Sequence, residues 1–115
     1  MNVLFILNDP PYGSERSYNG LRLARALAKQ PEQQVRVFLM GDAVACAKAG
    51  QKVPEGYYNA GDMVKLAAAA GEVGLCATCL AARGIEDAEL VPGALRRTLA
   101  DLAAWTAEAD KVLVF

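Results

Sequence analysis

The sequence predicts an α/β domain in which a parallel sheet carries helices on both faces. Two observations lead to this fold class. Short, nearly continuous apolar runs recur along the chain, a pattern typical of strands that are buried on both faces of a sheet. Segments with the apolar spacing of helices separate these runs, and this alternation favours parallel strands. A length of 115 residues is close to the commonest size of one domain, so we expect residues 1–115 to form a single domain.

The first half of the chain is predicted to hold two strands and two helices. Residues 2–7 form a continuous apolar run, and the Asn8-Asp-Pro-Pro that follows cannot continue a sheet. Ser14 is a good N-cap for a helix that runs to about residue 30. Residues 35–40 repeat the pattern of a buried strand, and Asp42 can cap a short alanine-rich helix that ends at Gly50.

The second half begins with an irregular loop at residues 51–58. Asn59, with Asp62 three residues later, predicts the start of a helix. The elements expected from there on are, in order, a helix at 60–70, a strand at 72–76, a short helix that ends at Gly84, a weak strand at 88–91, a long helix from Pro92-Gly93 to about 107 and a last strand at 111–115. This order keeps helices between the strands, as a parallel sheet requires.

Two thiols flank the predicted junction between the strand at 72–76 and the short helix. A thiol in the first turn of a helix faces unpaired backbone N–H groups and the positive end of the helix dipole, which lower its pKa. Cys79 is expected there, whereas Cys76 belongs to the strand end, where apolar packing raises a thiol pKa. The sequence therefore favours Cys79 as the reactive thiol. The simpler alternative is that both are small buried hydrophobes, as we expect of Cys46.

Composition excludes several classes of chemistry. The chain has no histidine, which removes imidazole general bases, Ser-His-Asp and Cys-His pairs and His-containing metal sites. A single Cys-x-x-Cys supplies too few ligands for a zinc site, and we expect neither a metal nor a cofactor. The net charge is −1 without a run of like charge, so nothing indicates binding to nucleic acid or to an anionic membrane.

The N-terminal apolar run predicts neither a signal peptide nor a membrane span, because it covers only residues 3–7 and has no basic flank. We therefore expect a cytoplasmic protein. An odd number of cysteines in a reducing compartment favours free thiols over a disulfide framework.

The candidate site lies where the strands end, because open parallel sheets bind ligands outside the carboxyl ends of their strands. The first strand brings Asn8 to this edge, the second brings Gly41-Asp42, and the third brings Cys76. The loop at 51–58 must climb back to the same edge, which would place Tyr58 near the thiols. The alternative is that the tyrosines cover a helix face or fill a subunit contact. Arg83, at the end of the short helix, is expected to cap it.

Several blocks of sequence resemble the DsrE/DsrF-like family along nearly the whole chain. The most specific are Pro54-Glu-Gly-Tyr-Tyr-Asn59 and Cys76-Ala-Thr-Cys79 followed by Ala82-Arg-Gly-Ile85. The resemblance, which is greatest to small stand-alone members, implies a three-layer α/β/α domain with a five-stranded parallel sheet that assembles into trimers or hexamers. For sulfur-relay members it also implies a cysteine that accepts sulfur as a persulfide, which falls on Cys79 or Cys76.

Three functions fit these observations. The leading hypothesis is a sulfur relay, in which a thiolate of the Cys76/Cys79 loop accepts sulfane sulfur from a donor protein and passes it to the thiol of an acceptor protein. The second is a non-enzymatic oligomeric protein that binds a small ligand at the edge, with structural thiols. The third is a dithiol redox protein. Asn8, Thr78 and Tyr58 are the candidate binding residues beside the thiols, and we expect the chain to self-associate.

Overall fold

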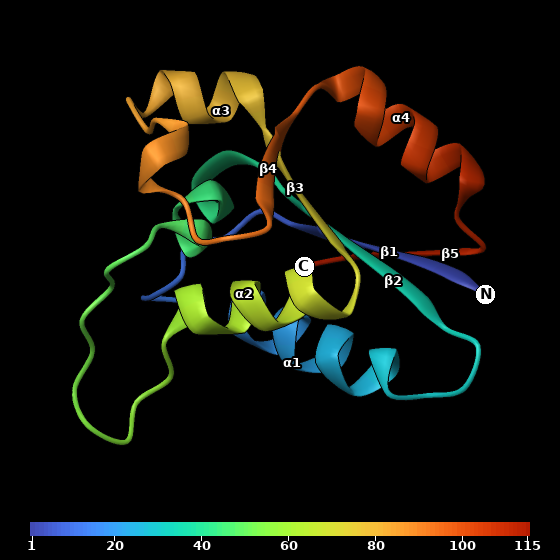
Figure 1. Cartoon of the computed structure of the whole chain (residues 1–115), viewed down its shortest axis with the longest axis horizontal. Helices are drawn as coiled ribbons and strands as arrows, with labels where there is room; N and C mark the ends of the chain where they lie inside the picture. The colour runs from blue at the N-terminus through green and yellow to red at the C-terminus, as the bar shows by residue number, and fades with distance from the viewer.

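The computed structural model describes residues 1–115 and contains one five-stranded sheet in which every neighbouring pair of strands is parallel (Figure 1). The strand order is β4-β3-β2-β1-β5. The strands are β1 (Asn2–Leu7), β2 (Gln34–Leu39), β3 (Glu72–Cys76), β4 (Ala94–Arg97) and β5 (Lys111–Val114). The predicted α/β class with a parallel five-stranded sheet is confirmed.

Helices cover both faces of the sheet. The helices are α1 (Arg16–Ala28), α2 (Ala60–Ala70), α3 (Ala77–Ala82) and α4 (Leu99–Glu108), with two short 3-10 segments, η1 (Gly41–Ala47) and η2 (Asp87–Glu89). Helices α1 and α2 lie together on one face, α4 lies on the other, and α3 lies beyond the end of β3 (Figure 1). None of these helices is long and apolar enough to cross a membrane.

Alternating side chains of the central strands fill the two layers of the core. On the α1 face, a Cβ added at Gly20 would lie 2.5 Å from Leu7 Cδ2, so glycine allows α1 to approach β1 closely. On the α4 face, Phe38 and Trp105 are both buried and meet edge to face, with ring centroids 5.9 Å apart. The two faces are unequal, because α4 is the only helix that lies across the second one.

The structure corrects the elements predicted around residues 88–107. The strand predicted at 88–91 lies at Ala94–Arg97, and the helix predicted from Pro92-Gly93 begins at Leu99. The helix begins after Thr98 and not at Gly93 because Thr98 forms a capping box with Asp101. The Thr98 hydroxyl accepts a hydrogen bond from the Asp101 N–H, and the Asp101 carboxylate accepts one from the Thr98 N–H. This capping box leaves the four preceding residues free to pair with β3.

Two other helix starts also differ from the prediction. The segment after β2 is a 3-10 segment that ends at Ala47, and Asp42 makes no capping hydrogen bond there. Helix α1 begins at Arg16 with Glu15 in the N-cap position, although Ser14 Oγ still accepts the Arg16 N–H at 3.3 Å. The boundaries of β1, α2 and β3 match the prediction, and Asn59 caps α2 through Asp62 as expected.

Candidate functional site

The thiol site forms where β3 turns into α3. Cys76 is the last residue of the strand and occupies the N-cap position of the helix, with a side chain that is almost entirely buried. Gly84 has a φ of +64° and lets the chain leave the helix, and the Ile85 N–H closes the end by donating to Leu80 O at 3.0 Å. The predicted strand-to-helix junction is thus confirmed.

Cys76 is the more acidic of the two thiols. Its Sγ lies 3.3 Å from the hydroxyl oxygen of Thr78. Burial by itself would raise the pKa of Cys76. The Cys79 thiol, the Thr78 hydroxyl and the backbone N–H groups of these two residues favour the thiolate more strongly, so the pKa of Cys76 lies below its ordinary value.

Cys79 lies three residues into α3 and is partly exposed. Burial raises its pKa, and the neighbouring Cys76 raises it further, because the Cys76 thiolate repels a second negative charge and accepts the Cys79 proton. The Gly41 N–H and the charge of Arg83 oppose this shift without reversing it. The directions of these two shifts favour the opposite order of acidity from the predicted one, with Cys76 the more acidic thiol.

The end of β2 supplies the second side of the thiol site. Gly41 and Asp42 follow this strand, as predicted, and lie beside α3. Arg83 donates from Nε and Nη2 to Asp42 Oδ1 at 3.2 and 2.9 Å, and from Nη1 to the carbonyl oxygen of Cys79 at 3.1 Å. Its predicted capping role is confirmed, and the ion pair additionally fixes α3 to η1.

The predicted binding residues divide between two places. Thr78 is at the thiol site. Asn8 lies at the end of β1, where its side-chain amide donates to Phe115 O at 3.2 Å, so it faces the chain end that follows β5. The carbonyl oxygen of Asn8 lies 3.7 Å from the position that a Cβ of Gly41 would take, so its backbone adjoins the β2 side of the site.

Tyr58 is not brought to the thiols. Its hydroxyl donates to Pro11 O at 2.8 Å, and its ring stacks on Tyr18 of α1 with centroids 4.1 Å apart. The loop at residues 51–58 does return to the carboxyl edge, but at the end of β1, on the side of α1 and α2 and away from α3 (Figure 1). Two strand spacings, about 10 Å, separate β1 from β3.

Two arginines of β4 belong to the site and were missed by sequence reasoning. Arg96 and Arg97 were predicted to lie inside a helix, so no side-chain position could be assigned to them. Arg96 donates from Nη1 to Ala77 O at 3.1 Å and from Nη2 to Ile85 O at 3.2 Å, and so holds both ends of α3. Arg97 is the direct neighbour of Cys76 in the adjacent strand.

The site is an open edge. No group of three or more His, Cys, Asp or Glu side chains is placed to hold a metal ion. The larger hollows of the surface lie away from the thiols. One of about 430 Å³ lies between α1 and α2, one of about 480 Å³ lies between the N-terminus, α1 and β5, and one of about 430 Å³ lies beside Asn8 and Phe115. The thiols therefore lie outside these hollows, with Cys79 partly exposed and Cys76 almost entirely buried.

Comparison with known proteins identifies the family. The DsrE/DsrF-like family model matches residues 1–115. The chain is 45% identical over 115 residues to protein YchN of Escherichia coli (strain K12), an alignment that covers 98% of this chain and 97% of that protein. This chain belongs to the DsrE/DsrF-like family. It is also 37% identical to an uncharacterized protein of Methanocaldococcus jannaschii over the full length of both chains.

Solved structures agree with this family assignment. The crystal structure of the ychN protein from E. coli superimposes with a TM-score of 0.94 at 44% identity and covers 100% of this chain and 99% of that one. A protein of unknown function from Methanobacterium thermoautotrophicum, MTH1491, has a TM-score of 0.78 at 15% identity and shows the shared fold alone.

Proposed function

We propose that this protein accepts sulfane sulfur as a persulfide on the Cys76/Cys79 loop and passes it to the thiol of a partner protein. The observation that carries the proposal is the acidic N-cap thiol of Cys76, which is stabilised by Thr78 and adjoined by a second thiol. Membership of the DsrE/DsrF-like family, which is associated with sulfur relay, supports it.

The transfer consists of two thiolate substitutions. The Cys76 thiolate attacks the outer sulfur of a donor persulfide; a new S–S bond forms, the S–S bond of the donor breaks, and the donor leaves as a thiolate with the electron pair. An acceptor thiolate then attacks the outer sulfur on Cys76, and Cys76 leaves as a thiolate. A thiol of low pKa is the better leaving group, so the acidity of Cys76 favours the second step.

Cys76 is the preferred carrier on this reasoning, although the sequence favours Cys79. The two residues have different parts in the proposal. The neighbouring Cys79 thiol lowers the pKa of Cys76 and so helps to keep it ionised. Cys46 has no part, because it is completely buried and its burial raises its pKa to about 12.

Self-association is a second part of the proposal. Apolar side chains remain exposed along the face that α4 covers incompletely: Leu95 of β4 is 53% exposed, Leu99 of α4 is 67% exposed and Val114 of β5 is 65% exposed. Several exposed apolar side chains on one face are typical of a surface that a partner covers. Light scattering at micromolar concentration is expected to give a mass above that of a monomer, and a monomer would contradict this part of the proposal.

The carrier thiol is identified by intact-mass measurement after incubation with a low-molecular-weight persulfide. Wild type and Cys46→Ala, the matched control, are expected to gain the mass of one sulfur atom, and Cys79→Ser is expected to gain it more slowly. Cys76→Ser is expected to gain none. Loading of Cys76→Ser at the wild-type rate would show that Cys79 is the carrier. Loading of neither wild type nor variants would leave the thiols structural and favour a ligand-binding protein.

Alkylation measures the order of thiol acidity directly. With iodoacetamide at a series of pH values, mapped by peptide mass, Cys76 is expected to reach half its maximal rate at a lower pH than Cys79. Each pKa unit between the two thiols changes the thiolate fraction at low pH about tenfold. Cys46 is expected to react slowest. Faster reaction of Cys79 than of Cys76 at neutral pH would contradict the assignment.

A further inference from the structure

The two thiols at the start of α3 occupy positions that a disulfide can join. Cys76 is the N-cap residue of this helix, and Cys79 is its third residue. Helix geometry places residues three apart about 5 Å from Cα to Cα, and a disulfide joins Cα atoms that are about 4.4–6.8 Å apart. The spacing of the pair thus permits a bond between the two sulfur atoms.

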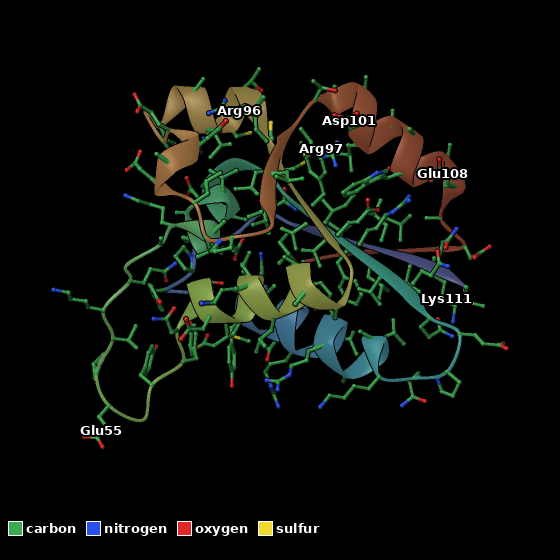
Figure 2. All side chains as sticks on the ribbon, viewed as in Figure 1. Glu55, Arg96, Arg97, Asp101, Glu108 and Lys111 are labelled. Carbon is green, nitrogen blue, oxygen red and sulfur yellow. The ribbon has the colours of Figure 1, made fainter.

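The start of α4 shows how side chains at these two positions meet. There the N-cap residue is Thr98 and the third residue is Asp101, which lies in the first turn of α4 (Figure 2). The Thr98 hydroxyl donates to Asp101 Oδ2 at 3.1 Å, so the two side chains are in contact. In α3 the Cys76 Sγ lies 3.3 Å from the hydroxyl oxygen of Thr78. The Cys76 side chain is therefore directed over the first turn of the helix, the turn that carries Cys79.

Both ends of α3 are fixed to the rest of the protein, which holds the pair in place. Arg96 lies beside α3 (Figure 2) and donates to Ala77 O at 3.1 Å and to Ile85 O at 3.2 Å. Arg83 donates to the carbonyl oxygen of Cys79 at 3.1 Å. Groups that are held in position react faster with each other than the same groups on separate molecules.

Burial separates the two sulfur atoms that a persulfide on Cys76 would contain. The inner sulfur is Cys76 Sγ itself, and Cys76 is only 6% exposed, whereas Cys79 is partly exposed. A thiolate that attacks the outer sulfur takes up the sulfane sulfur, and one that attacks the inner sulfur releases it as sulfide. The protein covers the inner sulfur from an outside thiol, but Cys79 belongs to the same helix turn and reaches it from within.

We propose that, when no acceptor is present, Cys79 attacks the inner sulfur of the persulfide on Cys76 and releases hydrogen sulfide. The protein is left with a disulfide between Cys76 and Cys79. This inference rests on the sulfur transfer proposed above and adds a second product to it, because sulfane sulfur then passes to an acceptor thiol or leaves as sulfide. The substrate class is a persulfide of low molecular weight, and a dithiol reductant returns the protein to its starting state.

The step balances without a further reactant. Cys79 gives its proton to the outer sulfur, and its thiolate attacks Cys76 Sγ. The bond between Cys76 Sγ and the outer sulfur breaks, and the electron pair leaves with the hydrosulfide anion. The two cysteines are oxidised to a disulfide, the sulfane sulfur is reduced to sulfide, and the total charge is unchanged. Burial and the neighbouring Cys76 raise the pKa of Cys79, so this thiol holds the proton that the step requires.

The test follows the loaded protein after the donor has been removed. Each protein is loaded with glutathione persulfide, separated from it by gel filtration and left without an acceptor. In wild type the added sulfur is expected to disappear, sulfide to appear in equal amount, and peptide mapping to find Cys76 linked to Cys79. In Cys79→Ser the added sulfur is expected to persist roughly a hundredfold longer. Cys46→Ala, which lacks a thiol outside the pair, is the matched control and is expected to behave as wild type.

A second measurement tests the pair without a persulfide, and so remains decisive if Cys79→Ser folds poorly. Glutathione disulfide oxidises neighbouring thiols by exchange. Wild type and Cys46→Ala are expected to form the disulfide between Cys76 and Cys79, which dithiothreitol then reverses. Cys79→Ala is expected to stop at a mixed disulfide with glutathione. If wild type forms no internal disulfide, or links two copies of the chain instead, the proposal is overturned.

The outcomes separate this inference from the sulfur relay. If wild type loads and keeps its sulfur as long as Cys79→Ser does, the relay stands and the release of sulfide is overturned. If Cys79→Ser releases sulfide at the wild-type rate, the relay again stands and the role of Cys79 is overturned. If glutathione disulfide closes the bond between Cys76 and Cys79 but no persulfide loads any of the proteins, the relay is overturned, and the release of sulfide falls with it.

Discussion

The carboxyl edge of the sheet has two halves, which differ in how far their polar groups are bound by other groups of the protein. The tyrosine half, formed by Tyr12, Tyr18, Tyr57 and Tyr58, is closed by its own contacts: Tyr58 donates to Pro11 O, and the Tyr12 hydroxyl accepts the N–H of Ala60 at 3.2 Å. The thiol half, formed by Cys76, Thr78 and Cys79, holds a nearly buried thiol and a partly exposed one at the start of α3.

This difference shows that a position at the carboxyl edge does not by itself make a site. Both halves follow the ends of parallel strands, where ligands bind in open α/β sheets. In the tyrosine half the hydroxyl groups hold the loop at residues 51–58 against Pro11 and Tyr12, and the Tyr58 ring stacks on Tyr18 of α1. In the thiol half the Cys79 thiol remains partly exposed, so it is accessible to a reactant.

The largest expected effect concerns Cys46, which lies between the halves and donates from Sγ to Asp9 O at 3.9 Å. Burial raises its pKa from 9.0 to about 12, so the folded protein keeps a proton that the unfolded chain loses above pH 9. The contribution of Cys46 to the free energy of unfolding is fully present below pH 9. It is lost as the pH rises from 9 toward 12, and the loss reaches up to about 4 kcal/mol.

Urea unfolding over this pH range, compared between wild type and Cys46→Ala, measures that contribution. The difference between the two proteins is informative because other groups that titrate at high pH, including Tyr58, are present in both. The free-energy gap between them is expected to shrink as the pH rises. A gap that is independent of pH would show that Cys46 ionises as easily as an exposed thiol, and that the interior between the two halves is open to solvent.

The second prediction tests whether the halves are independent. Tyr58→Ala removes a ring that stacks on Tyr18 and a hydroxyl that anchors the loop, and is expected to lower the free energy of unfolding by about 2 kcal/mol. Tyr57→Ala is the matched control, with a smaller expected loss, because Tyr57 is 52% exposed.

Neither tyrosine variant is expected to change the rate at which iodoacetamide alkylates Cys76, because Tyr58 contacts Pro11 and Tyr18 and lies two strands away from the thiols. Stability is read from urea unfolding and reactivity from peptide mass. If Tyr58→Ala changes the alkylation rate of Cys76 several-fold, the two halves act as one site, as the sequence predicts.

Sequence reasoning succeeded where local signals and tertiary packing agree. The apolar run of β1, the capping pair Asn59 and Asp62, and Gly84 at the end of α3 each have one favourable structure, and each was placed correctly. Strand β4 was misplaced because its sequence, Ala94-Leu-Arg-Arg97, lacks the pattern of a buried strand. It is a strand because β3 offers a free edge, which is a tertiary effect.

The site was predicted in outline and missed in detail for similar reasons. The junction and its two thiols follow from sequence. Which thiol is acidic depends on which one receives the hydrogen bonds, and that follows from the rotation of a short helix relative to its strand. Arg97 becomes the strand neighbour of Cys76 only through the register of β4 with β3, and no local pattern encodes that register. Tyr58 returns to the correct edge, but sequence does not specify which strand it reaches.

The smallest expected effect isolates one hydrogen bond in the thiol half. Thr78 is exposed, and its hydroxyl is the group that contacts Cys76 Sγ, at 3.3 Å. This contact favours the thiolate, so Thr78→Val, which keeps the shape of the side chain, is expected to raise the pKa of Cys76. Iodoacetamide at neutral pH should then react with Cys76 a few-fold more slowly, with the half-point of the rate profile at higher pH and stability nearly unchanged.

Thr106→Val is the matched control for this hydroxyl. Thr106 is also exposed on a helix, and its hydroxyl donates to Leu102 O at 2.7 Å within α4, so its loss is not expected to affect either thiol. If Thr78→Val leaves the Cys76 profile unchanged, the acidity of Cys76 comes from Cys79 and the backbone N–H groups alone. The thiol half would then depend, like the tyrosine half, on backbone placement more than on its exposed side chains.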